Sequence, residues 1–241
     1  TGLNTSSSTT TAHNNGITIQ GNVTSTGNGR LTFSGNSTVS GGATGYGIRL
    51  MSGATISSSA GDITLNGTSA SSFGVFSTYI NNINLTGTAD LYINSYGTSG
   101  FGHAGVGVAN ITGSTTANDV VLAADAALFY IDATNYQAIS TLGSVTLKPI
   151  TASTTLSVGS TGGTLYLQDV ALANISAGTF NFGSVSTGTL SINTARNFGT
   201  SHINFTSGGN ITLANTLATS GGNIIFNSPL VLSAASTLNA G

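Results

Sequence analysis

Few side chains of this 241-residue chain could perform acid–base chemistry. Its acidic residues are six aspartates, namely Asp62, Asp90, Asp119, Asp125, Asp132 and Asp169. Glycoside hydrolysis needs two carboxyl groups that face one cleft. The six are scattered along the sequence, and only Asp119, Asp125 and Asp132 lie close enough to gather locally. The aspartates are otherwise expected to serve turns and caps.

The histidines form no pattern of a metal or catalytic site. His202 alternates with the apolar Ile203 and should point to solvent, whereas His13 lies in a polar lead-in and His103 in a glycine-rich loop. None has a carboxylate or cysteine at metal-ligand spacing, and no G-x-S-x-G motif is present. The sequence therefore predicts no enzyme activity, no catalytic residue, no metal site and no cofactor.

Composition excludes several partners. Only 4% of the residues are charged, against about 25% in ordinary soluble domains, and the net charge is −2. Nucleic-acid binding needs clustered lysine and arginine, so it is not expected. No apolar run approaches the roughly 18 residues of a spanning helix, so no membrane insertion is expected. Because 39% of the residues are hydrophobic, the chain can still form a core.

A short apolar–polar–apolar triplet recurs along the chain and predicts half-buried strands, because alternate side chains point to opposite faces. The triplets occupy residues 17–19, 31–33, 48–50, 63–65, 83–85, 91–93, 145–147, 156–158, 165–167, 180–182, 190–192, 203–205, 211–213 and 224–226. Many triplets two units apart are about twenty residues apart, which is typical of one coil of a solenoid. The middle residues are mostly Thr, Ser and Asn, which could form polar ladders between coils.

We therefore expect an all-β fold, a parallel β-helix (β-solenoid) of about eleven coils of about twenty residues. Residues 1–241 should form a single elongated solenoid with less regular segments at 97–109 and 118–140. The second of these could contain a short helix or an irregular coil. Asp169 could cap a single helical turn that places Leu172 and Ile175 on one face.

Residues 167–183, LQDVALANISAGTFNFG, resemble the D-x-x-L-x-x-I-x-A-G-T-L-x-I-G element of filamentous-haemagglutinin-like exoproteins. Residues 209–213 (GNITL) and 222–226 (GNIIF) are similar to the G-G-N-I-T-L coils of that family, which includes autotransporter-type adhesins. The resemblance covers about residues 143–241. It implies a right-handed β-helix, export by bacteria and a role as a fibre or adhesin shaft, and it supplies no catalytic residues.

The leading hypothesis is a non-enzymatic fibre or adhesin shaft, extracellular or at the bacterial cell surface, that assembles end to end. Its expected partners are further copies of itself and host or surface glycans. Outward aromatic rings could make surface contacts, or could instead shield neighbouring coils; they are Tyr92, Tyr166, Tyr79, Tyr96 and Phe101. The alternative is a polysaccharide-binding or polysaccharide-cleaving β-helix. Nine Asn-x-Ser/Thr sequences leave glycosylation open, because the composition alone predicts about seven and most of them are therefore compositional.

Overall fold

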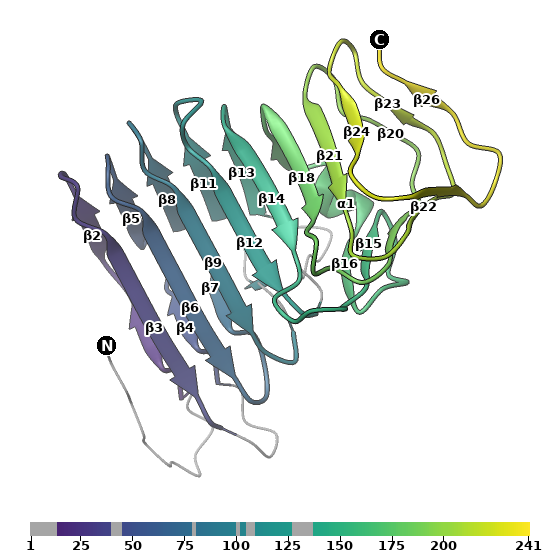
Figure 1. Cartoon of the computed structure of the whole chain (residues 1–241). Helices are drawn as coiled ribbons and strands as arrows, with labels where there is room; N and C mark the ends of the chain where they lie inside the picture. The colour runs from purple at the N-terminus through teal and green to yellow at the C-terminus, as the bar shows by residue number, and fades with distance from the viewer. Residues whose placement is uncertain (1–13, 40–44, 79–80, 100–101, 105–108, 127–136) are drawn as a thin grey trace.

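The computed structural model describes residues 14–39, 45–78, 81–99, 102–104, 109–126 and 137–241 (Figure 1). In these residues nearly all of the regular secondary structure is β-strand, and every strand pair is parallel, which confirms the all-β class. One helical turn, α1 (Asp169–Leu172), accompanies the strands in the described part.

The largest sheet has eight strands, which Figure 1 shows side by side in chain order. They are β3 (Leu31–Ser37), β6 (Ile63–Ser69), β9 (Leu91–Tyr96), β12 (Val120–Ala124), β14 (Ser144–Lys148), β18 (Thr179–Gly183), β21 (His202–Thr206) and β24 (Ile224–Phe226).

Four further sheets complete the described part. A six-stranded sheet contains β2 (Asn22–Ser25), β5 (Thr55–Ser58), β8 (Asn81–Leu85), β11 (Ala109–Gly113), β13 (Gln137–Thr141) and β17 (Ile175–Ser176). A four-stranded sheet contains β1 (Ile17–Ile19), β4 (Ile48–Leu50), β7 (Val75–Thr78) and β10 (Gly102–Ala104). A five-stranded sheet contains β15 (Leu156–Val158), β16 (Leu165–Leu167), β19 (Leu190–Ile192), β22 (Ile211–Leu213) and β25 (Leu230–Leu232). A three-stranded sheet contains β20 (Arg196–Asn197), β23 (Leu217–Ala218) and β26 (Leu238–Asn239).

The chain visits the sheets in rotation, and the distance in sequence between paired strands changes along the molecule. Paired residues in the eight-stranded sheet are 32 residues apart at Ser34 and Asn66 but 21 apart at Ile203 and Ile224. The expected spacing of about twenty residues therefore describes only the C-terminal part. Paired residues are further apart in the rest of the chain, for example 32 residues between Leu31 and Ile63 and 35 between Val145 and Phe180.

Most triplets place their outer residues in the core, as predicted, for example Ile203 and Phe205, whereas the triplets near the two ends are only partly buried. Strand residues outside the triplets join this core. In the six-stranded sheet Ile56, Ile83, Ile111 and Ile139 stack in register and are all buried. Such a column buries apolar area continuously from strand to strand, and each buried Å² stabilises the fold by about 25 cal/mol. Short strands that could not hold a sheet alone are stabilised in this way.

Glycine is needed where β6 passes the start of β7. Gly67 in β6 lies against Gly74, which precedes Val75, and a Cβ on Gly67 would collide with the carbonyl group of Gly74. Gly35 and Gly47 repeat this arrangement one circuit earlier. The close approach of two backbones, rather than a positive φ angle, therefore requires these glycines.

Outward polar residues, in the middle of the triplets or at other outward positions of the strands, form the predicted polar ladders. Asn94 Nδ2 donates to Asn66 Oδ1 at 2.8 Å, and Asn204 Nδ2 donates to Asn181 Oδ1 at 2.9 Å. On the six-stranded sheet Thr112 Oγ1 donates to Asn84 Oδ1 at 2.8 Å. These bonds link successive strands without any charge.

The segments expected to be less regular are described in part. The described residues of 118–140 form the regular strands β12 and β13. Most of the stretch where a short helix or irregular coil is expected falls within residues 127–136, which lie outside the described residues. Within 97–109, residues 102–104 form β10. The helical turn at Asp169 is confirmed, but Gln168 occupies the cap position without a side-chain hydrogen bond, and Asp169 lies in the first turn.

Candidate functional site

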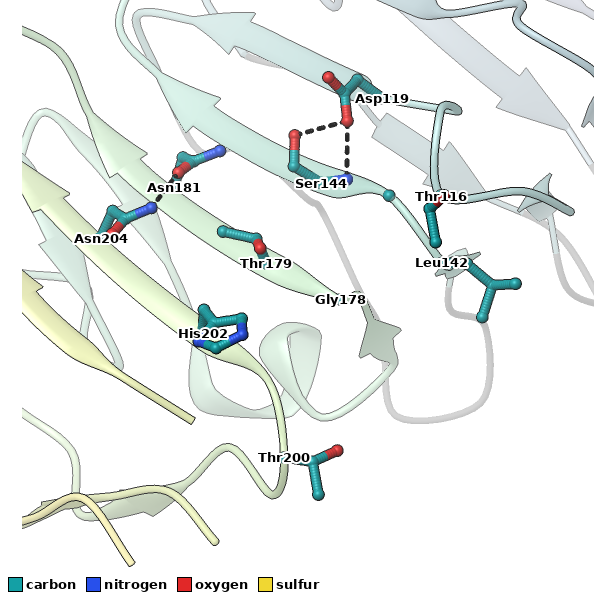
Figure 2. A pocket seen from close by; sticks show the side chains of 11 residues that line it. Thr116, Asp119, Leu142, Ser144, Gly178, Thr179, Asn181, Thr200, His202 and Asn204 are labelled. Atoms are coloured by element: carbon teal, nitrogen blue, oxygen red, sulfur yellow. Dashed lines mark hydrogen bonds between the residues drawn. The ribbon is translucent and has the colours of Figure 1, made fainter. Parts of the chain in front are cut away.

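A polar groove of about 600 Å³ crosses the outward face of the eight-stranded sheet. It lies over the N-terminal ends of β14, β18 and β21 and over Asp119, which directly precedes β12 (Figure 2). The strand register lines up one side chain from each strand: Asp119, Ser144, Thr179 and His202. A second row, Asn181 and Asn204, lies beside the first.

The hydrogen bonds of this first row fix the direction of its polar groups. Asp119 Oδ1 accepts two hydrogen bonds of 2.8 Å, from the backbone N–H and the hydroxyl of Ser144. His202 Nδ1 accepts a hydrogen bond of 3.1 Å from the backbone N–H of Asn223. In a neutral imidazole the other nitrogen then carries the proton, so His202 presents Nε2–H as a donor.

Strand spacing decides what Asp119 and His202 can do together. They stand three strands apart, and parallel strands are about 4.8 Å apart, so the two residues are about 14 Å from each other. A general acid and base pair acts within hydrogen-bond reach or through one water. The row therefore presents separate hydrogen-bonding groups along a line and does not bring these two side chains into a reacting pair.

A row of carboxylates continues from the groove toward the N-terminus, which corrects the expectation that the aspartates are scattered. Asp62 Oδ1 accepts from the backbone N–H of Asp90 at 3.4 Å, and Asp90 Oδ1 accepts from that of Asp119 at 2.9 Å. Arg30 Nε ends the row at 3.5 Å from Asp62 Oδ2. Each carboxylate thus caps the start of the next strand.

The local cluster expected from Asp119, Asp125 and Asp132 is not formed by the described members. Asp119 and Asp125 lie at opposite ends of β12, about 20 Å apart at 3.3 Å per residue. Asp125 instead caps the chain after β14, accepting from the backbone N–H groups of Ile150 and Thr151 at 2.9 and 2.8 Å. Asp132 lies outside the described residues.

Sequence reasoning missed the aspartate row because it assumed a spacing of about twenty residues. The observed offsets are 28 residues from Asp62 to Asp90 and 29 from Asp90 to Asp119. The usable signal is the residue directly before each apolar run, which is aspartate before Ile63, Leu91 and Val120. The last of these runs was not recognised as a strand.

The carboxylates in this row perturb each other. Burial is the largest cause that raises the pKa of Asp90, and the neighbouring charges of Asp119 and Asp62 raise it further. Tyr92 Oη donates to Asp90 Oδ2 at 3.3 Å. The pKa of Tyr92 is raised as well, by burial first and by the charge of Asp90 second.

The aromatic residues proposed for surface contacts do not gather into one platform. Tyr92 is half-buried on β9 and Tyr166 is half-buried on β16, in a different sheet. Tyr96, at the end of β9, is 45% exposed. Tyr79 and Phe101 lie outside the described residues. None of the described three lines the groove.

The remaining sequence expectations concern metals and membranes. His202 is exposed, as expected. His13 lies outside the described residues, and for His103 the structure describes the strand β10 but not the side chain. The described part contains no group of three or more histidines and acidic residues that could hold a metal ion. No helix in the described part is long and apolar enough to cross a membrane.

Comparison with known proteins identifies no relative. No protein-family model, no curated protein and no solved structure matches this chain.

Proposed function

We propose that the chain is a non-enzymatic shaft segment of a bacterial surface or extracellular fibre or adhesin. Its fold would be a single elongated right-handed parallel β-helix. The observation that carries this proposal is the eight-stranded parallel sheet that spans residues 31–226. A continuous sheet of this kind resists bending along its stacking direction, which is what a shaft requires.

The rotation of the chain through the sheets supports the β-helix. Strands β1, β2 and β3 belong to three different sheets, and β4, β5 and β6 repeat the same order. Each strand then pairs with its equivalent one circuit later, for example Ile17 with Ile48 and Leu31 with Ile63. The right hand of the helix and the export by bacteria rest on the resemblance to filamentous-haemagglutinin-like exoproteins.

We assign end-to-end assembly with further copies of the chain to the apolar side chains of the last strands. Strands β24, β25 and β26 each pair with one neighbour only. Their side chains include Ile225 at 43% exposure, Leu232 at 57% and Leu238 at 47%. Apolar side chains at this edge favour pairing with a further strand layer, supplied either by a continuation of the same chain or by a second copy.

Electron microscopy and small-angle scattering over a range of protein concentrations test this function. A rod of the same cross-section at all concentrations, lengthening into fibres as concentration rises, is expected. Leu232→Lys should shorten the fibres, because a charge at the edge opposes strand pairing. Val185→Lys, at a position that is 82% exposed in the turn after β18, is the matched control. A compact particle would refute the shaft, and equal fibres from Leu232→Lys would refute the assembly contact.

A further inference from the structure

We propose that the groove over β14, β18 and β21 is a binding site for an uncharged oligosaccharide that lies across the strands, parallel to the direction in which they stack. The groove presents a line of hydroxyl, amide and imidazole groups from Asp119 to His202 (Figure 2). This inference does not depend on end-to-end assembly, because the groove lies on the side of the stack and its described lining residues all belong to one chain.

The length and openness of the groove fit a linear ligand. Its first row crosses four neighbouring strand positions, a span of about 14 Å at 4.8 Å per strand. Backbone at Gly143 and Gly178 forms part of the floor, and both glycines are held against the preceding strand turn. A Cβ on Gly178 would collide with the carbonyl oxygen of Leu142, so glycine is required for this close backbone approach beside the groove.

The polar groups of the groove can donate and accept, as sugar hydroxyls do. His202 Nε2–H is a donor, because Nδ1 already accepts from the backbone. Thr179 Oγ1 makes no hydrogen bond within the described residues. Ser144 donates both of its hydrogen bonds to Asp119 Oδ1, so Asp119 Oδ2 can accept a hydrogen bond from a ligand. Asn181 and Asn204 add amide groups at the side of this row.

The charge of the groove disfavours an anionic ligand. No arginine or lysine lines the groove, and its single charged side chain is the carboxylate of Asp119. A phosphate, sulfate or uronate group would meet that carboxylate without a cation to offset it. Leu142 at the rim is 60% exposed and offers an apolar contact for the C–H face of a sugar ring. Without an aromatic platform we expect weak affinity, with a Kd on the order of 1 mM.

The test measures binding by saturation-transfer NMR and titration with neutral tetrasaccharides of glucose, mannose and N-acetylglucosamine. Tetragalacturonate serves as the anionic probe. Thr179→Val removes the hydroxyl and keeps the branched shape, and His202→Asn keeps an acceptor for Asn223 while removing the Nε2 donor. Each lost hydrogen bond should weaken binding about 2- to 10-fold. The matched control, Thr212→Val, lies on β22 in the five-stranded sheet and should bind like the parent chain.

Binding of at least one neutral probe that both groove variants weaken and the control does not would support the site. Three results would overturn the proposal. The first is that no neutral tetrasaccharide binds at about 10 mM, a concentration at which a site with a Kd of about 1 mM would be mostly filled. The second is that tetragalacturonate binds as well as the neutral probes, and the third is that Thr212→Val weakens binding as much as the groove variants do. Circular dichroism and scattering on the same samples report the fold and the rod shape. A failed glycan site therefore stays distinguishable from a failed shaft.

Discussion

Phe205 provides a direct test of the stacked core. Its side chain is fully buried on β21, between Phe182 on β18 at 5.2 Å and Phe226 on β24 at 5.3 Å between ring centroids. Both neighbouring rings lie nearly parallel to it, with interplanar angles of 15°. Phe205→Ala would therefore open a cavity in the middle of a column, where neither neighbour can move in without leaving its own strand.

The expected loss in free energy of unfolding follows from this burial. Replacing a buried phenylalanine by alanine costs about 3–5 kcal/mol, from lost transfer energy and the remaining cavity. Each aromatic pair contributes about 0.5–1.5 kcal/mol beyond its buried area, so two lost pairs place Phe205→Ala at the upper end of that range. Phe205→Leu refills most of the cavity and should lose less than half as much.

The assay combines urea denaturation with hydrogen exchange resolved by segment. Stability in stacked folds depends on neighbouring layers, so faster exchange should concentrate in β18, β21 and β24. Exchange in β3 and β6, at the far end of the eight-stranded sheet, should stay unchanged. A loss below about 1 kcal/mol would mean that the column repacks and is not close-packed, and that result would refute the reasoning.

Three further predictions concern the described residues. Asp90→Asn should raise the urea midpoint at pH 7. The pKa of Asp90 is raised in the folded chain, so the stability that the protonated carboxyl group contributes is complete below the ordinary aspartate pKa and is lost as pH rises through the raised value. The difference in midpoint between Asp90→Asn and the parent chain should therefore shrink on acidification, and a difference that stays constant with pH would contradict this prediction. Asn still accepts from Asp119 N–H. Gly67→Ala should lower the free energy of unfolding by about 1–3 kcal/mol, because the new Cβ collides with Gly74. Gly21 has open space around it, so Gly21→Ala should change that free energy by less than about 0.5 kcal/mol. The urea midpoint of the parent chain should change little between about 0.05 and 1 M NaCl. The described residues contain only two ion pairs, both partly exposed, and such pairs contribute little to the free energy of unfolding. A strong salt dependence would contradict this prediction.

The alternation of side chains was predictable from the sequence because it depends on neighbours in the chain. Ile203 and Phe205 point inward and Asn204 outward, as period two requires. The register between strands was not predictable in the same way, because it depends on the length of each connection. Between Thr146 and Asn181 the offset is 35 residues, since β15, β16 and α1 lie between them.

The groove was hidden from sequence analysis for the same reason. Ser144, Thr179 and His202 are ordinary polar residues, and nothing in their local sequences distinguishes them from many others. They form a line only after the register has placed them on neighbouring strands. A site of this kind is a property of the stacking, so it becomes visible when the offsets are known.

The aspartate row explains how a stacked fold can tolerate like charges. Parallel strands repeat about every 4.8 Å, so identical charges in one row repel along its whole length. Asp62, Asp90 and Asp119 persist because each carboxylate accepts the backbone N–H that starts the next strand, a charge-assisted bond that offsets part of the repulsion. Arg30 neutralises one end, and at the other end the row continues with the uncharged Ser144. Extending the row by Ser144→Asp should therefore lower stability at neutral pH and recover it in acid, and an unchanged midpoint at both pH values would mean that the charges are already fully screened.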